Sequence, residues 1–275
     1  MEYREISSAA GKIPGGYFKR EGRPTEHEII CARIIDRSLR PLFPKTWRKE
    51  LQVIATVVSA DGQNDPAMLA LTGASLAVHL SDVPFGGPVV GVRVGRIDGK
   101  FEVNLAKEQL DTSDIDLVMA VSPDAIVMVE GGANFVSEEN VVDALLFGHK
   151  EAGEVLSLFN RWHDELGKPK QEHTPYDISE EMKNELRNKY GEEASKLIKI
   201  RVKQERYEAA YALKERVKAD YADEQYEKDL PFILEYVSGL KGEFMRRQLI
   251  DENVRIDGRK PDEVRPISID VGVLP

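Results

Sequence analysis

The sequence predicts an α+β domain followed by a small all-α domain. Up to about residue 167, several β-rich runs follow one another between amphipathic helical patterns. Beyond that point the strand signals vanish, charged residues dominate, and apolar residues recur at helical spacing. We therefore expect a first domain over 1–167, a linker over 168–175, an all-α domain over 176–251, and the start of a further domain over 252–275.

The first domain opens on a loop and a helix. Gly and Pro punctuate residues 11–24, GKIPGGYFKREGRP, on both sides of an aromatic and basic tip. Thr25 and Glu28 have the spacing of a capping box, so a helix is expected from there until Pro41. The sequence indicates no strand before this loop, and we expect the domain to lack its first strands.

A β-branched run over 51–60 predicts a buried strand, and Asn64-Asp65-Pro66 predicts the start of a helix that ends near Leu80. Asp98-Gly99 joins two alternating runs, which is a strong hairpin signal. Two more short strands lie on either side of Pro123-Asp124. Ser137 then predicts the N-cap of one long helix that reaches about Leu166.

Apolar residues at helical spacing continue through the second domain, where we expect several short helices: Tyr207, Ala210, Tyr211, Val217 and Tyr221. Its charge runs are interpreted as solvated faces, to which we assign no chemistry. From Asn253 onward the pattern predicts a turn followed by one or two strands.

Composition restricts the class of protein. The net charge is −10, but residues 1–50 contain 11 Lys and Arg against 7 Asp and Glu, so a polyanion can still be steered there. The chain has one cysteine, Cys31, which excludes an internal disulfide and a multi-cysteine zinc site. We find no signal-like core and no apolar stretch long enough to span a bilayer, and we expect a cytoplasmic protein without a membrane partner.

The tip of the first loop is the main candidate site, formed by Tyr17, Phe18, Lys19 and Arg20 together with Arg23. Two aromatic rings followed by cations can stack on the bases and neutralise the phosphates of single-stranded RNA. The alternative is a surface loop whose aromatic side chains pack on a neighbour.

A second candidate is the trio Arg33, Arg37 and Arg40 on the following helix, where spacings of four and three place them on one face. They can form a basic stripe for phosphate, or they can pair with acidic neighbours such as Asp36. The sequence leaves both interpretations open.

The remaining polar residues are given structural roles. His79 and His149 lie in apolar helices and are expected to be packed and hydrogen-bonded, and Cys31 to be buried and inert. Asp61, Asp65 and Asp82 occupy turns, where Asp is favoured. No histidine pair at metal-ligand spacing is present, and we assign no metal site.

Several segments together resemble the polynucleotide phosphorylase family over nearly the whole chain: AGKIPGGYFKREGRPTEHEIICARIIDRSLRPLFP, LQVIATVVSADGQNDPAMLALTGASLAVHLSDVPFGGP, VRVGRIDG, SEENVVDALLFGHKE and RIDGRKPDEVRPI. The resemblance implies an RNase PH-like core lacking its first strands, an all-α domain, and the start of a second RNase PH-like core. In the family a tip like that at residues 17–20 lines the constriction of a trimeric ring; here Tyr17 and Lys19 replace a Phe and an Arg.

The resemblance further implies a polyribonucleotide nucleotidyltransferase, a 3′→5′ phosphorolytic exoribonuclease that degrades mRNA with orthophosphate as co-substrate and releases nucleoside diphosphates. It implies Mg²⁺ as cofactor, bound by a second core that this chain lacks, a homotrimeric ring, and an endoribonuclease or helicase as partner. We therefore expect no catalytic residue in this chain. We expect it to supply the RNA entrance constriction and ring interfaces, and to be inactive alone.

Two alternatives remain. The chain can be a noncatalytic RNA-binding or scaffold module of an RNA-degradation assembly, which the acidic balance after residue 50 favours. It can also be a phosphate-dependent enzyme complete in one core, as RNase PH is.

Overall fold

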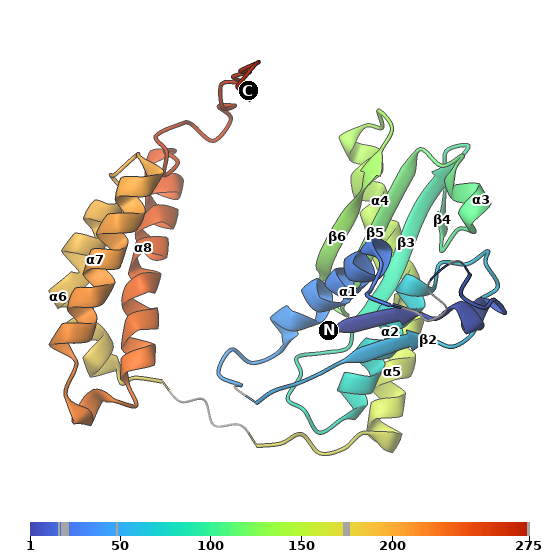
Figure 1. The fold of residues 1–275 in the computed structure, drawn as a ribbon, viewed down its shortest axis with the longest axis horizontal. Coiled ribbons are helices and arrows are strands. Elements are labelled where there is room, and N and C mark those ends of the chain that lie inside the picture. Colours follow the sequence, from blue (N-terminus) through green and yellow to red (C-terminus); the bar gives the residue numbers. More distant parts are fainter. Residues whose placement is uncertain (16, 18–21, 48, 173–176, 274–275) are drawn as a thin grey trace. The chain divides into compact units, whose positions relative to one another are not determined.

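The computed structural model describes residues 1–15, 17, 22–47, 49–172 and 177–273. Its contacts divide the chain into two compact units, residues 1–175 and 176–275, each of which is described by itself (Figure 1). No helix among the described residues is long and apolar enough to cross a membrane.

A four-stranded antiparallel sheet forms the centre of the first unit. Its strands in chain order are β3 (Val90–Ile97), β4 (Lys100–Val103), β5 (Ile115–Val121) and β6 (Ile126–Ala133). Their spatial order is β4-β3-β5-β6. Asp98 and Gly99 both have positive φ, 50° and 77°, as the two-residue turn of a tight hairpin requires, and this predicted hairpin is confirmed.

A separate pair of strands corrects the expected start of the unit. β1 (Glu2–Glu5) runs parallel to β2 (Ile54–Val57), with Tyr3 opposite Ala55. The strand was missed because four residues, three of them charged, carry little periodicity of their own. Its position depends on a partner about fifty residues later and on Tyr3, whose side chain is 1% exposed in the core.

The described residues of the first unit also form five helices: α1 (Glu26–Leu39), α2 (Pro66–Leu80), α3 (Lys107–Leu110), α4 (Glu138–Glu151) and α5 (Gly153–Leu166). Short 3₁₀ turns occupy Ser7–Ala10 and Arg40–Leu42. The predicted N-terminal signals are confirmed. Thr25 and Glu28 form a reciprocal capping box on α1, and the Asp65 carboxylate accepts from the backbone N–H of Ala67 at the start of α2.

The single long helix predicted over 137–166 is instead two helices. Ala152 is the residue shared between α4 and α5, and Gly153 begins α5. Glycine is the weakest helix former after proline, so the regular helix breaks there at little cost. Ala152 is 2% exposed, and the break lets both helices pack on one core.

The sheet separates two apolar cores. Ala120 and Met128 pack with α1 and α2 on one face, whereas Met119 and Val121 pack with α4 and α5 on the other. Gly91 allows α2 to approach the sheet closely, since a β-carbon there would be 2.8 Å from the carbonyl oxygen of Met68. The unit is therefore an α+β structure with helices on both faces of its sheet (Figure 1).

The second unit is a bundle of three helices, α6 (Glu180–Leu197), α7 (Lys203–Asp220) and α8 (Leu230–Glu252), with a 3₁₀ turn at Glu224–Tyr226. The prediction of several short helices is wrong, because 18 to 23 residues form each helix. Leu186, Val217 and Ile233, all fully buried, give the three helices a common core.

The strands expected after Asn253 are absent from the described residues 253–273. The alternating residues Ile267, Ile269, Val271 and Val273 suit a strand, but each is at least 72% exposed. A strand needs a neighbour to accept its backbone hydrogen bonds, and the described residues place none beside this segment.

Candidate nucleic-acid interface

The predicted loop tip lies mostly outside the described residues. Phe18, Lys19 and Arg20 fall there, and their role stays a prediction. Tyr17 is 93% exposed and Arg23 is exposed as well. The end of the loop is close to β1, because a guanidinium nitrogen of Arg4 lies 3.5 Å from the carbonyl oxygen of Gly22.

Two of the three α1 arginines form ion pairs within the protein, and the third is left for a phosphate. Arg37 pairs with Glu130 of β6 at 2.5 Å, and Arg40 pairs with Asp36 one turn earlier. Structural ion pairing therefore accounts for these two side chains. Arg33 is exposed and has no carboxylate partner among the described residues, so it alone of the three is available to a phosphate.

The described residues contain no group of three or more His, Cys, Asp or Glu side chains that could hold a metal ion. The carboxylates of Asp61 and Asp65 accept hydrogen bonds from backbone N–H groups, as expected for Asp in turns. Asp82 accepts from the Gln171 amide at 2.7 Å.

The histidine prediction is partly wrong. His79 is buried as expected, but neither ring nitrogen has a hydrogen-bond partner among the described residues, and the centre of its ring lies 4.5 Å from that of His163. Burial, with the nearby His163 and Lys170, lowers the pKa of His79 to about 4. Cys31 is buried, and burial raises the pKa of its thiol to about 12, so it is protonated and unreactive near neutral pH.

A cluster of cations at one end of the helical bundle was missed by sequence reasoning. Two segments far apart in the chain meet there, the connection between α6 and α7 and the turn that follows α8. We name this cluster the basic end, and it consists of Lys199, Arg201, Lys203, Arg206, Arg255, Arg259 and Lys260.

Direct contacts bring the two segments together. The side chain of Arg201 lies against Gly258, since a β-carbon at residue 258 would be 3.0 Å from its Cζ atom. Arg206 donates to the carbonyl oxygens of Ile200 and Arg201, at 2.7 and 3.3 Å, and so holds the α6–α7 connection in place.

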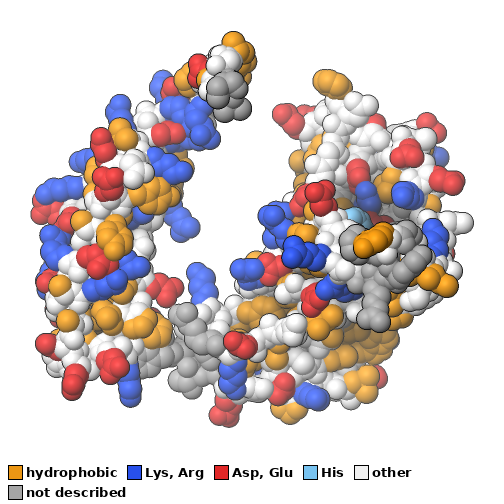
Figure 2. All heavy atoms as spheres, in the orientation of Figure 1, with side chains coloured by type: hydrophobic (Ala, Val, Ile, Leu, Met, Phe, Trp, Pro, Cys, Tyr) orange, Lys and Arg blue, Asp and Glu red, His pale blue; other side chains and the backbone are white. Residues whose placement is uncertain are grey.

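The charges of the basic end are largely uncompensated. Among its seven cations, and within the described part of the chain, Arg259 is the only one paired with a carboxylate, that of Asp257 at 2.7 Å. The hydrogen bond from Arg259 lowers the pKa of Asp257 to about 2. Lys199, Arg201, Lys203 and Lys260 are exposed, and blue side chains gather near the C-terminal segment in Figure 2.

The signal that could have found the basic end is local. Residues 196–206 contain five Lys or Arg and one acidic residue, in an otherwise acidic chain. That run was interpreted as a solvated face. Its functional meaning depends on Arg255, Arg259 and Lys260, which only the folded bundle brings beside it. Exposed, unpaired cations that converge from two segments are suited to binding a phosphate backbone.

Three family models match the chain in succession. Residues 1–84 match "3' exoribonuclease family, domain 1", residues 87–151 match "3' exoribonuclease family, domain 2", and residues 181–260 match "Polyribonucleotide nucleotidyltransferase, RNA binding domain". The third match covers nearly all of the three-helix bundle and all seven residues of the basic end.

Curated relatives agree with these matches. The chain is 42% identical over 275 residues to the polyribonucleotide nucleotidyltransferase of Trichlorobacter lovleyi, and 46% identical over 281 residues to that of a Sulfurihydrogenibium species. The Bacillus licheniformis protein of the same name is 42% identical over 276 residues. All of this chain is covered in each case, and it spans about 39% of the length of each relative.

Proposed function

Because the chain belongs to the polyribonucleotide nucleotidyltransferase family, we propose that it forms part of a 3′→5′ phosphorolytic exoribonuclease and contributes RNA binding to it. The observation that carries the proposal is the basic end. It presents uncompensated cations within the region that matches the family's RNA-binding domain.

The proposed reaction shortens RNA by one nucleotide at a time. An oxygen of orthophosphate attacks the last phosphorus of the chain, and the bond from that phosphorus to the 3′ oxygen of the preceding ribose breaks. The 3′ oxygen takes a proton, and a nucleoside diphosphate leaves. Mg²⁺ would offset the phosphate charge. The role proposed for this chain is to hold the RNA backbone, which the largely unpaired cations of the basic end support.

Family membership supports three further proposals. The chain assembles into a homotrimeric ring, it acts in the cytoplasm, and it cooperates with an endoribonuclease or a helicase. The loop residues Phe18, Lys19 and Arg20, with Tyr17 and Arg23, are proposed to contact RNA at the entrance of that ring. Sedimentation of the purified chain with and without RNA tests the ring directly.

Binding of a fluorescent oligo(A) to the 275-residue chain tests the RNA-binding proposal. The variant K199Q/R201Q/K203Q removes three cations of the basic end. We expect weaker binding and a shallower salt dependence, by roughly 0.7 in the logarithmic slope for each phosphate that the variant no longer neutralises. If this variant binds oligo(A) with wild-type affinity, the basic end does not contribute to RNA binding.

A matched control removes the same amount of charge elsewhere in the bundle. Lys183, Lys189 and Lys218 each pair with a carboxylate of the second unit, at 2.7 to 3.0 Å. The variant K183Q/K189Q/K218Q should keep most of the affinity for oligo(A). An equal loss of affinity in both triple variants would mean that net charge, and not the basic end, is being measured.

Release of ADP from poly(A) with Mg²⁺ and orthophosphate, against a phosphate-free control, tests the proposed reaction. We expect no release of ADP from this chain alone.

A further inference from the structure

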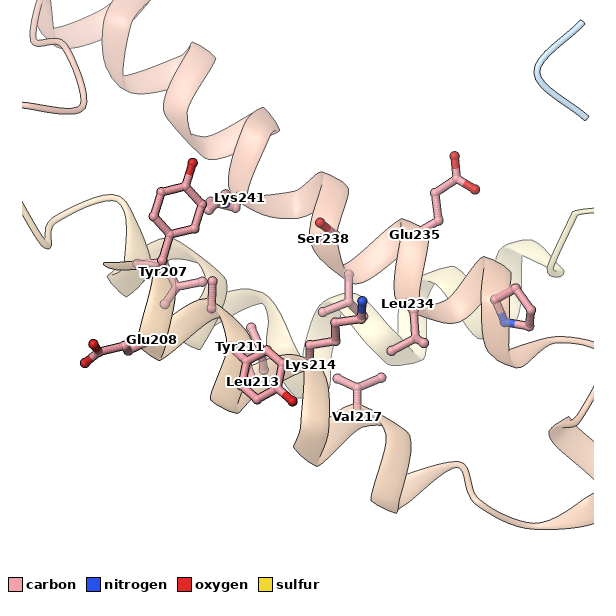
Figure 3. Close-up of a pocket in the computed structure, with 14 residues that line it drawn as sticks. Tyr207, Glu208, Tyr211, Leu213, Lys214, Val217, Leu234, Glu235, Ser238 and Lys241 are labelled. Carbon is pink, nitrogen blue, oxygen red and sulfur yellow. The ribbon is translucent and has the colours of Figure 1, made fainter. Parts of the chain in front are cut away.

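A groove with a volume of about 820 Å³ lies between α7 and α8 in the helical unit (Figure 3). Its floor is the bundle core: Leu213, Val217 and Val237 are each at most 4% exposed. Its rim includes Tyr207 and Tyr211 on α7, Ser238 on α8, and the lysines Lys214 and Lys241.

The two rim tyrosines differ from the structural tyrosines of the same unit. Tyr190 and Tyr221 are buried, and their hydroxyls donate to Asp220 and Glu185, at 2.7 and 3.0 Å. Tyr207 and Tyr211 are 59% and 65% exposed, and no hydrogen bond to either hydroxyl is found among the described residues. Spaced by four residues, they lie on the same face of α7, one turn apart. The bundle therefore leaves two large aromatic faces open to a ligand.

The charges around the rim favour an anionic ligand with flat apolar parts. The Lys203 ammonium lies 5.8 Å from the centre of the Tyr207 ring, and Lys214 points into the groove in Figure 3. Glu208 and Glu235 point away from the middle of the groove in the same view, and Glu208 accepts from Gln204 on its own helix at 2.9 Å. Cations beside open aromatic faces are the combination with which proteins hold single-stranded nucleic acid.

The groove is continuous with the basic end. Lys203 belongs to the basic end and begins α7, one turn before Tyr207 and two turns before Tyr211. The helix rises about 12 Å over these eight residues, a distance that roughly three to four nucleotides stacked 3.4 Å apart would cover. A strand whose phosphates lie on the basic end can thus place its next bases over the two rings.

We propose that the α7–α8 groove is a base-stacking site for single-stranded RNA, in which Tyr207 and Tyr211 each take one base and Lys214 and Lys241 face the intervening phosphates. This inference rests on the proposed RNA-binding function and assigns the contacts that recognise bases. The basic end supplies backbone attraction, and the groove supplies contacts that a chain without bases cannot make.

The test compares two ligands of equal charge on the 275-residue chain, a fluorescent ten-nucleotide oligo(A) and an abasic ribose-phosphate ten-mer. In Y207L/Y211L we expect affinity for oligo(A) to fall roughly ten- to a hundredfold, and affinity for the abasic chain to be unchanged. The variant Y207F/Y211F keeps both aromatic rings. Because the proposed contact is stacking, this variant should bind oligo(A) within about twofold of wild type. F135L, which alters an exposed aromatic residue of the other unit, is the matched control.

The outcomes separate the groove from the proposed function. If Y207L/Y211L binds oligo(A) as wild type does while K199Q/R201Q/K203Q does not, the groove proposal is overturned and RNA binding by the basic end stands. Equal reductions in affinity for oligo(A) and the abasic chain would also overturn it, since stacking would not be what was removed. Failure of the wild type to bind either ligand would overturn both. If the leucine variant loses helicity, Y207Q/Y211Q replaces it, because glutamine is a good helix former without a ring. The phenylalanine pair must still bind.

Discussion

The guanidinium of Arg201 lies against the backbone of Gly258, and so joins the α6–α7 connection to the turn that follows α8. A β-carbon at residue 258 would be 3.0 Å from Cζ and Nε of Arg201. Gly258 also has a φ of +86°, a conformation that other residues adopt at a cost. Because residue 258 has no side chain, the guanidinium of Arg201 can pack against its backbone. This contact joins the two segments of the basic end.

Replacing this glycine should loosen the turn. In G258A the backbone strain costs about 1 to 2 kcal/mol. Exchange of the amide of Arg255, which donates to the carbonyl oxygen of Arg259 at 2.8 Å, should therefore become roughly 5 to 30 times faster. Hydrogen exchange followed by NMR measures it. G239A is the control, because a β-carbon there meets nothing within 4 Å; unchanged exchange in G258A would show that the turn is not strained.

The stability of the first unit should depend on pH through His79. Burial lowers its pKa from 6.5 to about 4, so the unfolded chain binds more protons between these values. The contribution of neutral His79 to the free energy of unfolding is therefore fully present above about pH 6.5. It is lost as the pH falls toward 4, and the loss is on the order of 2 kcal/mol. Both tryptophans, Trp47 and Trp162, lie in this unit, so urea unfolding followed by tryptophan fluorescence reports on it.

The variant H79L removes the titrating group and the two unpaired ring nitrogens. We expect its free energy of unfolding to change less between pH 7 and pH 4.5 than that of the wild type. The difference in favour of H79L should be largest at pH 4.5. An unchanged pH dependence in H79L would show that other groups cause it.

Two glycines of the α4–α5 region should respond in opposite directions to the same substitution. At Gly148 a β-carbon would be 2.6 Å from Cγ2 of Val94 and 2.9 Å from Sδ of Met119, so α4 could not keep its distance from the sheet. G148A should destabilise the unit by about 1 to 3 kcal/mol. At Gly153 a β-carbon meets nothing within 4 Å, and G153A should stabilise it by up to about 1 kcal/mol. Urea unfolding compares the pair, and the same sign for both would contradict the packing argument.

The three α1 arginines should not contribute equally to RNA binding. Arg37 and Arg40 already pair with Glu130 and Asp36, whereas Arg33 does not pair with a carboxylate among the described residues. We expect R33Q to lower the affinity for oligo(A) and to reduce the logarithmic salt slope by about 0.7. R40Q should change neither. Fluorescence anisotropy at two salt concentrations measures both variants. Equal effects of R33Q and R40Q would favour the interpretation that the α1 arginines form one basic stripe that binds phosphate.

Features set by a few neighbouring residues were predictable. The capping box of Thr25 and Glu28, the start of α2 at Pro66 and the Asp98-Gly99 hairpin all formed as expected, because each depends on hydrogen bonds or backbone angles within about four residues. The long helix was predicted as one because its apolar pattern continues through Gly153, and pattern alone does not say where packing separates α4 from α5.

Features that need a distant partner were not predictable. β1 exists because β2 lies beside it, and the strands expected after Asn253 lack such a neighbour among the described residues. The α1 arginines were left between two roles because Glu130, which takes Arg37, lies 93 residues further along the chain.

The sequence by itself determined the α+β and all-α units, their helix starts and turns, and a resemblance that extends over nearly the whole chain. Those properties follow from local propensity and from the order of residues. Only the tertiary structure decided which tyrosines of the helical unit are buried and which stay open beside a groove, and which cations converge on the basic end. Burial and charge balance depend on the elements that pack around a side chain, and these come from parts of the chain that no short pattern connects.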